Sequence, residues 1–117
     1  MIDSRLIDYL DHMTQAIELA VGYVRGMERP EFLADRRTQQ AVIFNLIVLG
    51  EAATKILDAY AEFAAKTDAI PWASMKGMRN RIAHGYFDID LDIVWETVQS
   101  DLPALLESIR EISKSSK

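Results

Sequence analysis

The sequence predicts an all-α fold, an antiparallel up-and-down bundle of four to five helices that occupies residues 1–117 as a single domain. Apolar residues recur at steps of three and four along most of the chain, which is the helical period. No segment shows sustained two-residue alternation or a hairpin turn signal, so strands are not expected. Half of the residues are hydrophobic, and 117 residues suit one core.

The first helix is predicted over residues 4–24, with Asp3 or Ser4 as its N-cap and with Gly26 and Pro30 ending it. Its apolar stripe consists of Leu6, Leu10, Met13, Ile17, Ala20, Val21 and Val24.

The second helix is predicted over residues 35–58, and its middle, residues 41–53, is apolar almost all the way round. Such a helix must be covered on more than one side. In a chain this short we expect another subunit to supply part of that cover. Gly50, Ala52 and Ala53 are small enough to let a neighbouring helix approach closely.

The rest of the chain predicts a short helical piece over residues 59–66 and then two longer helices. Pro71 suits the first turn of the third helix, and Gly85 ends it. The last helix covers residues 90–112, and Pro103 predicts a kink within it. The buried stripes of these two helices are Trp72, Met75, Met78 and Ile82, and then Leu91, Val94, Val98, Leu102, Leu105, Ile109 and Ile112.

Composition excludes several classes of function. The absence of Cys excludes disulfides, thiolate zinc sites and cysteine nucleophiles. The first residues lack the basic and apolar regions of a signal peptide, and the longest apolar run, residues 41–53, is too short to span a bilayer. We therefore expect a cytoplasmic protein without a membrane partner. A net charge of −5 argues against non-specific coating of nucleic acid.

The segment Arg79-Asn80-Arg81-Ile82-Ala83-His84-Gly85-Tyr86 holds the side chains that could bind a phosphodiester and move protons on it. Arg79 and His84 would point about 140° apart on a continuous helix, whereas Asn80 and His84 share a face. Arg79 and His84 converge only if the helix ends near His84 or if a second chain supplies one of them. A structural cap and a solvated ion pair remain the alternative.

Two polar residues interrupt the apolar second helix. Burying Asn45 or Glu51 costs about 1–3 kcal/mol if the side chain stays unsatisfied. One interpretation is a hydrogen bond across the bundle. The other is a position near the site, with Glu51 paired to an arginine.

The acids Asp88, Asp90 and Asp92 resemble a metal loop only superficially. A calcium-binding loop counted from Asp88 needs Gly and Glu where Ile93 and Gln99 stand. We interpret these acids as caps and a solvated helix start that can also contact a basic partner. No metal and no other cofactor is predicted.

Four motifs in order resemble the HEPN domains, and most closely their HepT branch. Arg-Asn-x-x-Ala-His at residues 79–84 follows a helix bearing Trp and Met and precedes Gly-Tyr. Residues 35–42 leading into Leu-Gly-Glu-Ala-Ala at 49–53 are similar to the second helix of that branch. Ile-Pro-Trp at 70–72 and the tail from Val94-Trp95 to Leu102-Pro103 also match, so the likeness covers nearly the whole chain.

The resemblance implies a metal-independent endoribonuclease whose site forms between two protomers of a homodimer. Arg79 would bind phosphate and stabilise the developing charge, His84 would transfer protons, and Asn80 would orient His84 or a phosphate oxygen. RNA would be cut by attack of a ribose 2′-hydroxyl, which leaves a cyclic phosphate. Residues that could contact RNA or support the site are Arg81, Lys76, Glu51 and Asn45.

The resemblance also implies a partner and a control point. HepT toxins are paired with a minimal nucleotidyltransferase (MNT) antitoxin, as in a type VII-like toxin–antitoxin system, and Tyr86 matches the tyrosine that this partner modifies with AMP. The residues alone favour simple packing of Tyr86 after the helix end. The competing functions are a non-catalytic helical adaptor or nucleotide-binding subunit of a nucleotidyltransferase complex, and a plain dimeric bundle.

Overall fold

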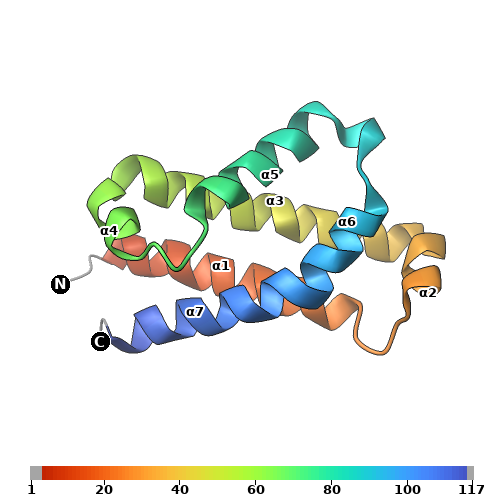
Figure 1. Ribbon diagram of the computed structural model, residues 1–117, viewed down its shortest axis with the longest axis horizontal. Coiled ribbons are helices and arrows are strands. Elements are labelled where there is room, and N and C mark those ends of the chain that lie inside the picture. Colours follow the sequence, from red (N-terminus) through yellow and green to blue (C-terminus); the bar gives the residue numbers. More distant parts are fainter. Residues whose placement is uncertain (1–3, 116–117) are drawn as a thin grey trace.

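The computed structural model describes residues 4–115, except for the side chains of Tyr86 and Ser115. The longer helices are α1 (Ser4–Tyr23), α3 (Arg36–Ala59), α5 (Trp72–His84) and α7 (Leu102–Ser115). The shorter elements are α2 (Arg29–Ala34), α4 (Ala61–Lys66), a 3₁₀ turn (Tyr86–Asp88), α6 (Leu91–Glu96) and a π-helical turn (Thr97–Asp101). Successive long helices run in opposite directions (Figure 1). The predicted all-α, up-and-down architecture is confirmed, and residues 4–115 contain no strand.

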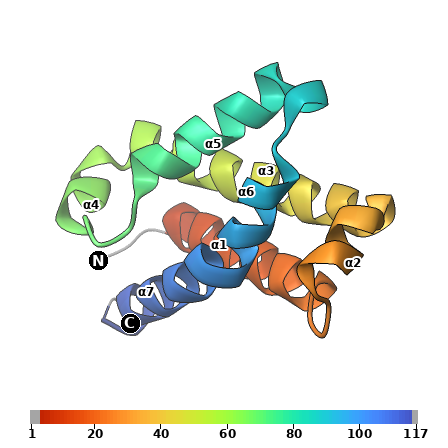
Figure 2. The same ribbon diagram turned by 45° about the vertical axis from the view of Figure 1, so that its right-hand side comes forward.

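Helix α3 is the centre of the bundle, with α1 packed on one side and α5 on another (Figures 1 and 2). Two sides of this apolar helix are therefore covered by helices of the same chain. The sequence alone predicts that another subunit supplies part of this cover. A further side stays open, because Phe44 is 64% exposed. Gly50 allows the close approach that its size predicted, and the neighbour is α5 of the same chain.

Within the described residues, α3 is also the helix that is long and apolar enough to cross a membrane, judged by length and composition. In its most apolar window 56% of the residues are buried inside the protein. This burial is typical of the core helix of a bundle.

The start of α3 is set by Asp35. Its carboxylate accepts hydrogen bonds from the Thr38 amide at 3.2 Å and from the Thr38 hydroxyl at 2.7 Å. These bonds favour the ionised carboxylate, and they lower the pKa of Asp35 below its usual value. The predicted helix start near residue 35 is confirmed. The proposed cap of the first helix at Asp3 lies outside the described residues, while α1 itself begins at Ser4 and ends before Gly26, which adopts a φ of 81°.

Helix α2 was not predicted, because its six residues carry no apolar period long enough to recognise. Pro30 lies in its first turn, and the Glu28 amide donates to the Glu31 carboxylate at 2.9 Å. Burial of Phe32 holds it in place, because the Phe32 ring lies 5.4 Å from the ring of Trp95. Tertiary packing thus stabilises a helix that propensity alone would not form.

The predicted disturbance at Pro103 takes the form of a π-helical turn, Thr97–Asp101, just before it. Proline has no amide hydrogen and cannot complete the α-helical ladder, so the chain rearranges one turn upstream. The segment bends where α6 meets α7 (Figure 1). Trp72, which the sequence places in a buried stripe, is buried as predicted, and Trp95 is also a core residue.

Candidate functional site

Helix α5 carries the predicted site residues and ends as expected at Gly85. The Gly85 amide donates to the Arg81 carbonyl at 2.9 Å, which completes the last turn. The Asp88 amide donates to the Gly85 carbonyl at 2.8 Å and begins the 3₁₀ turn. His84 is therefore the last residue of the helix, at the negative end of its dipole, a position that suits a cationic side chain.

The Arg79 side chain lies against α3 and is 24% exposed. Its Nε is 3.3 Å from Oε1 of Glu51, and its Nη2 donates to Oγ1 of Thr54 at 3.3 Å. The Nε atom is buried and lacks hydrogen-bond geometry to any described residue, so its attraction to Glu51 is purely one of charge. The pairing of Glu51 with an arginine, one of two alternatives from the sequence, is what the structure contains.

Gly50 makes this arrangement possible. A Cβ atom on Gly50 would collide with Cβ of Arg79 and would lie 3.0 Å from the carbonyl oxygen of Met75. The backbones of α3 and α5 therefore cross at the level of Arg79. Glu51 and Thr54, which follow Gly50 on α3, are brought to the guanidinium by this crossing.

Asn80 and His84 have no such partners. Asn80 is half-buried and His84 is exposed, and neither side chain forms a hydrogen bond or ion pair with the rest of the described chain. Arg79 points into α3 while His84 lies five residues further on, about 140° around the helix. No hydrogen bond within the described residues joins Arg79 to His84.

The two remaining cations of α5 differ in surroundings. Arg81 is exposed, and its Nη1 passes 3.3 Å from the position that a Cβ of Gly77 would take. Lys76 is half-buried and pairs with no acid among the described residues. Since Glu51 offsets the charge of Arg79, Lys76 and Arg81 are the cations of α5 without an acidic partner among the described residues.

Asn45 lies away from these residues. It is 5% exposed, and its side-chain amide donates to the Ala41 carbonyl of its own helix at 2.9 Å rather than across the bundle. Nine residues separate Asn45 from Thr54, which sets them on opposite faces of α3. The structure therefore does not bring Asn45 to the side of α3 that holds Arg79.

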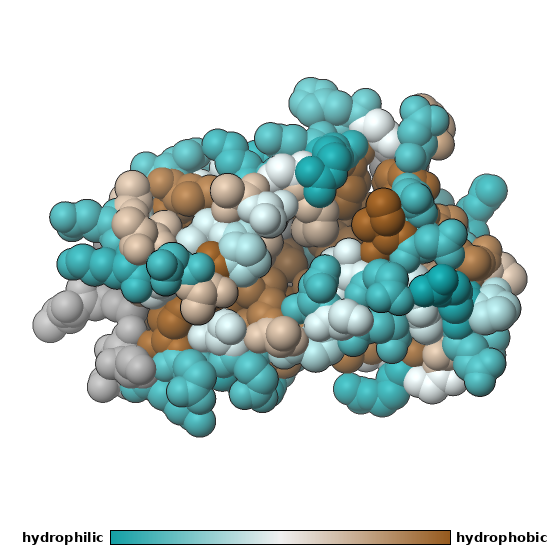
Figure 3. All heavy atoms as spheres, viewed as in Figure 1, coloured by the Kyte–Doolittle hydropathy of each residue, from teal (hydrophilic) through white to brown (hydrophobic). Residues whose placement is uncertain are grey.

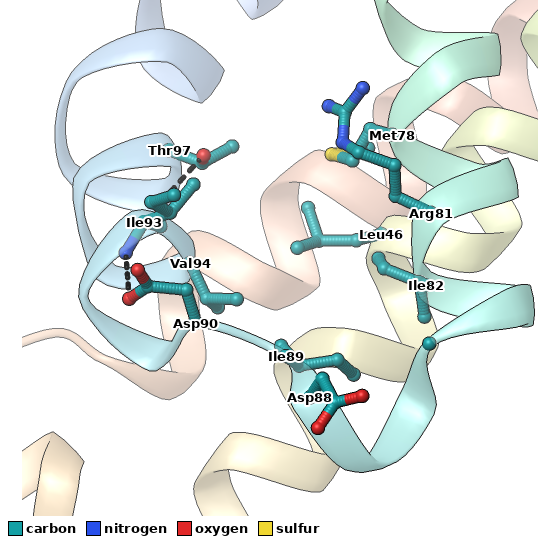
Figure 4. Close-up of a pocket in the computed structure, with 11 residues that line it drawn as sticks. Leu46, Met78, Arg81, Ile82, Asp88, Ile89, Asp90, Ile93, Val94 and Thr97 are labelled. Atoms are coloured by element: carbon teal, nitrogen blue, oxygen red, sulfur yellow. Dashed lines mark hydrogen bonds between the residues drawn. The ribbon is translucent and has the colours of Figure 1, made fainter.

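A trough runs between α5 and the α6–α7 segment. One end of it is a pocket of about 250 Å³, where Leu46 of α3, Ile82 of α5 and Val94 of α6 converge (Figure 4). The space-filling view shows apolar side chains gathered along this hollow (Figure 3). Arg81 lies on its α5 side, Asp90 lies across from it beside α6, and Asp88 lies at its base in the turn after α5 (Figure 4). The surface of the trough is thus mainly apolar, and Arg81 is the cationic residue among the described residues that line it.

The acids after α5 have the structural role that the sequence suggested. The Asp90 carboxylate caps α6 by accepting from the amides of Asp92 and Ile93 at 3.0 and 3.3 Å. Asp92 lies 3.8 Å from Arg29 of α2. Asp90 is therefore a helix cap, and Asp92 helps to hold α2 against α6.

Tyr86, the predicted modification site, begins the 3₁₀ turn two residues after His84. Its side chain lies outside the described part of the structure. Its backbone adjoins the end of α5.

The sequence interpretation did not single out Thr54. Its hydroxyl is one of the polar groups that contact Arg79, and the residue is 8% exposed. The available signal was its spacing. Thr54 lies four residues after Gly50, so it shares the face of α3 on which a neighbouring helix was expected to approach.

Comparisons with known proteins indicate the family of the chain. The model of the family described as ribonuclease HepT-like matches residues 13–112. A protein named "probable ribonuclease HepT" from Thermococcus cleftensis is 36% identical over 92% of this chain and 94% of its own. Candidate RNases from Caldanaerobacter subterraneus (31% identical) and Methanocaldococcus jannaschii (35% identical) each align with 93% of this chain, and with 95% and 84% of their own.

No solved structure matches the chain. The family model nevertheless covers most of the chain, and the relatives align with it over nearly its whole length. The chain therefore belongs to the HepT-like ribonuclease family.

Proposed function

We propose that this protein is a cytoplasmic, metal-independent endoribonuclease that acts as the toxin of a toxin–antitoxin pair. Its membership in a ribonuclease family and the names of its relatives support RNA as the substrate. The observation that carries the proposal is that the side chains of α5 differ in their contacts. Arg79 is held against α3 with Nη1 unpartnered, while Asn80 and His84 are unpaired at the helix end.

The proposed reaction is an internal transfer at phosphorus. The ribose 2′-hydroxyl loses its proton to a base and attacks the adjacent phosphorus, and the bond from phosphorus to the 5′-oxygen breaks. A general acid protonates that leaving oxygen, so the products are a 2′,3′-cyclic phosphate and a 5′-hydroxyl. Arg79 stabilises the charge that builds up on the phosphate oxygens, and His84 transfers protons. Asn80 orients His84 or a phosphate oxygen.

The proposed site is shared between two copies of the chain. Arg79 and His84 diverge on α5, and the motif has one histidine, whereas the reaction benefits from both a base and an acid. A two-fold dimer supplies two of each. Phe44, an exposed apolar residue seven positions before Glu51, lies on nearly the same face of α3 as Glu51. A second copy covering that face would bury Phe44 close to the Arg79–Glu51 pair.

The test is incubation of the purified protein with single-stranded RNA in EDTA. We expect cleavage, with cyclic phosphate ends detected by mass spectrometry of the fragments. RNA that stays intact with a folded, dimeric protein contradicts the proposal and favours a non-catalytic adaptor of a nucleotidyltransferase complex. Cleavage that requires an added divalent ion contradicts the metal-independent mechanism.

We further propose that a nucleotidyltransferase antitoxin silences the site by adding AMP to Tyr86. The tyrosine hydroxyl attacks the α-phosphate of ATP, the bond to pyrophosphate breaks, and the hydroxyl proton is released. The backbone position of Tyr86, two residues after His84, supports this proposal. Added phosphate would repel the RNA phosphate and occupy its space.

Mass spectrometry after co-expression with the antitoxin tests the modification. We expect an AMP adduct on Tyr86, loss of RNA cleavage, and continued activity of a Tyr86→Phe variant in the presence of the antitoxin. An inactive complex in which Tyr86 is unmodified rules out this mechanism of control.

A further inference from the structure

The hydroxyl of Thr54 forms two hydrogen bonds, one within α3 and one to Arg79 of α5. Its Oγ1 donates to the Gly50 carbonyl at 2.7 Å, within α3. A hydroxyl has a single proton, so only its lone pairs remain for other partners. These lone pairs face Nη2 of Arg79 at 3.3 Å. The Gly50 carbonyl thus fixes Thr54 as an acceptor that is aimed at the guanidinium.

The contacts of Arg79 divide its guanidinium into a held part and a free part. Glu51 attracts the buried Nε, and Thr54 accepts from Nη2, whereas Nη1 has no partner among the described residues. The Glu51 side chain is long and half exposed, so it can change conformation. With Glu51 as its sole partner, the arginine would move together with the carboxylate. Thr54 is buried and short, and therefore supplies the rigid contact.

We propose that Thr54 is a positioning residue that holds Arg79 so that Nη1 meets the scissile phosphate. This inference rests on the proposed ribonuclease function and adds a residue that acts through Arg79 without touching RNA. Misplacing a charge-stabilising group by about 1 Å can lower a rate about a hundredfold. The effect falls mainly on kcat, because Arg79 acts on charge that builds up during attack.

The test compares Thr54→Val with Thr54→Ser. Valine keeps the shape but removes the acceptor, whereas serine keeps the hydroxyl. We expect Thr54→Val to lower kcat about tenfold to a hundredfold with little change in KM, and Thr54→Ser to stay within about threefold of the wild type. Thr97→Val is the matched control, because the Thr97 hydroxyl makes the same type of bond, to the Ile93 carbonyl at 2.8 Å, and forms no hydrogen bond with an arginine in the described chain.

A second readout is independent of cleavage. The Nε–H resonance of Arg79, assigned by its loss in Arg79→Lys, is expected to shift in Thr54→Val and to keep its position in Thr54→Ser. Unchanged kcat in Thr54→Val, an equal loss in all three variants, or an unmoved Nε–H resonance in Thr54→Val overturns the positioning role. If the wild type does not cut RNA, the ribonuclease proposal fails, and the resonance alone decides whether Thr54 holds Arg79.

Discussion

Replacement of His84 by alanine is expected to lower the rate of RNA cleavage about 10²–10⁴-fold, the usual contribution of a positioned proton-transfer group. The fold should be unaffected. His84 is exposed and its side chain forms no hydrogen bond or ion pair with the described chain, so the free energy of unfolding should change by less than about 0.5 kcal/mol. Single-turnover cleavage and thermal unfolding measure the two effects.

The second histidine of the chain provides the control. His12 is exposed on α1, and His12→Ala should cleave RNA like the wild type. An equal loss of activity in both variants would point to a general effect on the protein or to a contaminating nuclease. Full activity of His84→Ala would remove His84 from the mechanism.

Replacement of Gly50 by alanine is expected to damage both stability and activity. The added Cβ would collide with Cβ of Arg79 and approach its Cγ and the Met75 carbonyl to 3.0 Å each. Backbone atoms cannot move aside as a flexible side chain can, so α3 and α5 must separate. Overpacking of this kind costs about 1–3 kcal/mol, partly offset by up to about 1 kcal/mol from the better helix propensity of alanine. Arg79 would also move relative to Thr54.

Gly22→Ala separates the two contributions. Gly22 lies near the end of α1, and a Cβ there would meet nothing within 4 Å. This variant should gain up to about 1 kcal/mol from propensity alone and keep its activity. Denaturant unfolding of both variants, alongside cleavage assays, makes the comparison. A Gly50→Ala protein as stable and active as Gly22→Ala would contradict the close crossing of α3 and α5.

The long helices could be predicted because their apolar periods extend over several turns. Helix α2 could not, since Phe32 stabilises it only by packing on Trp95, which lies far away in the sequence. Pro103 signalled a disturbance, but whether the chain would kink or form a π-turn depends on how α6 and α7 pack.

For the candidate site, the sequence names residues but does not determine their contacts. Helix geometry alone indicates that Arg79 and His84 diverge. The holding of Arg79 by Glu51 and Thr54 depends on where α3 and α5 cross, and Gly50 sets that crossing. Asn45 is likewise buried and bonded to the Ala41 carbonyl of its own helix because of the way α3 is oriented between α1 and α5. The local sequence around Asn45 does not specify that orientation.

The central claim is that Arg79 of one copy acts with His84 of another. Mixed dimers of an Arg79→Ala chain and a His84→Ala chain, purified through two different affinity tags, test it most directly. Each mixed dimer would keep one Arg79 and one His84, supplied by different copies, at the shared site, so we expect it to recover part of the wild-type rate and to exceed either variant alone. Mixed dimers of verified composition that remain inactive would contradict the shared site.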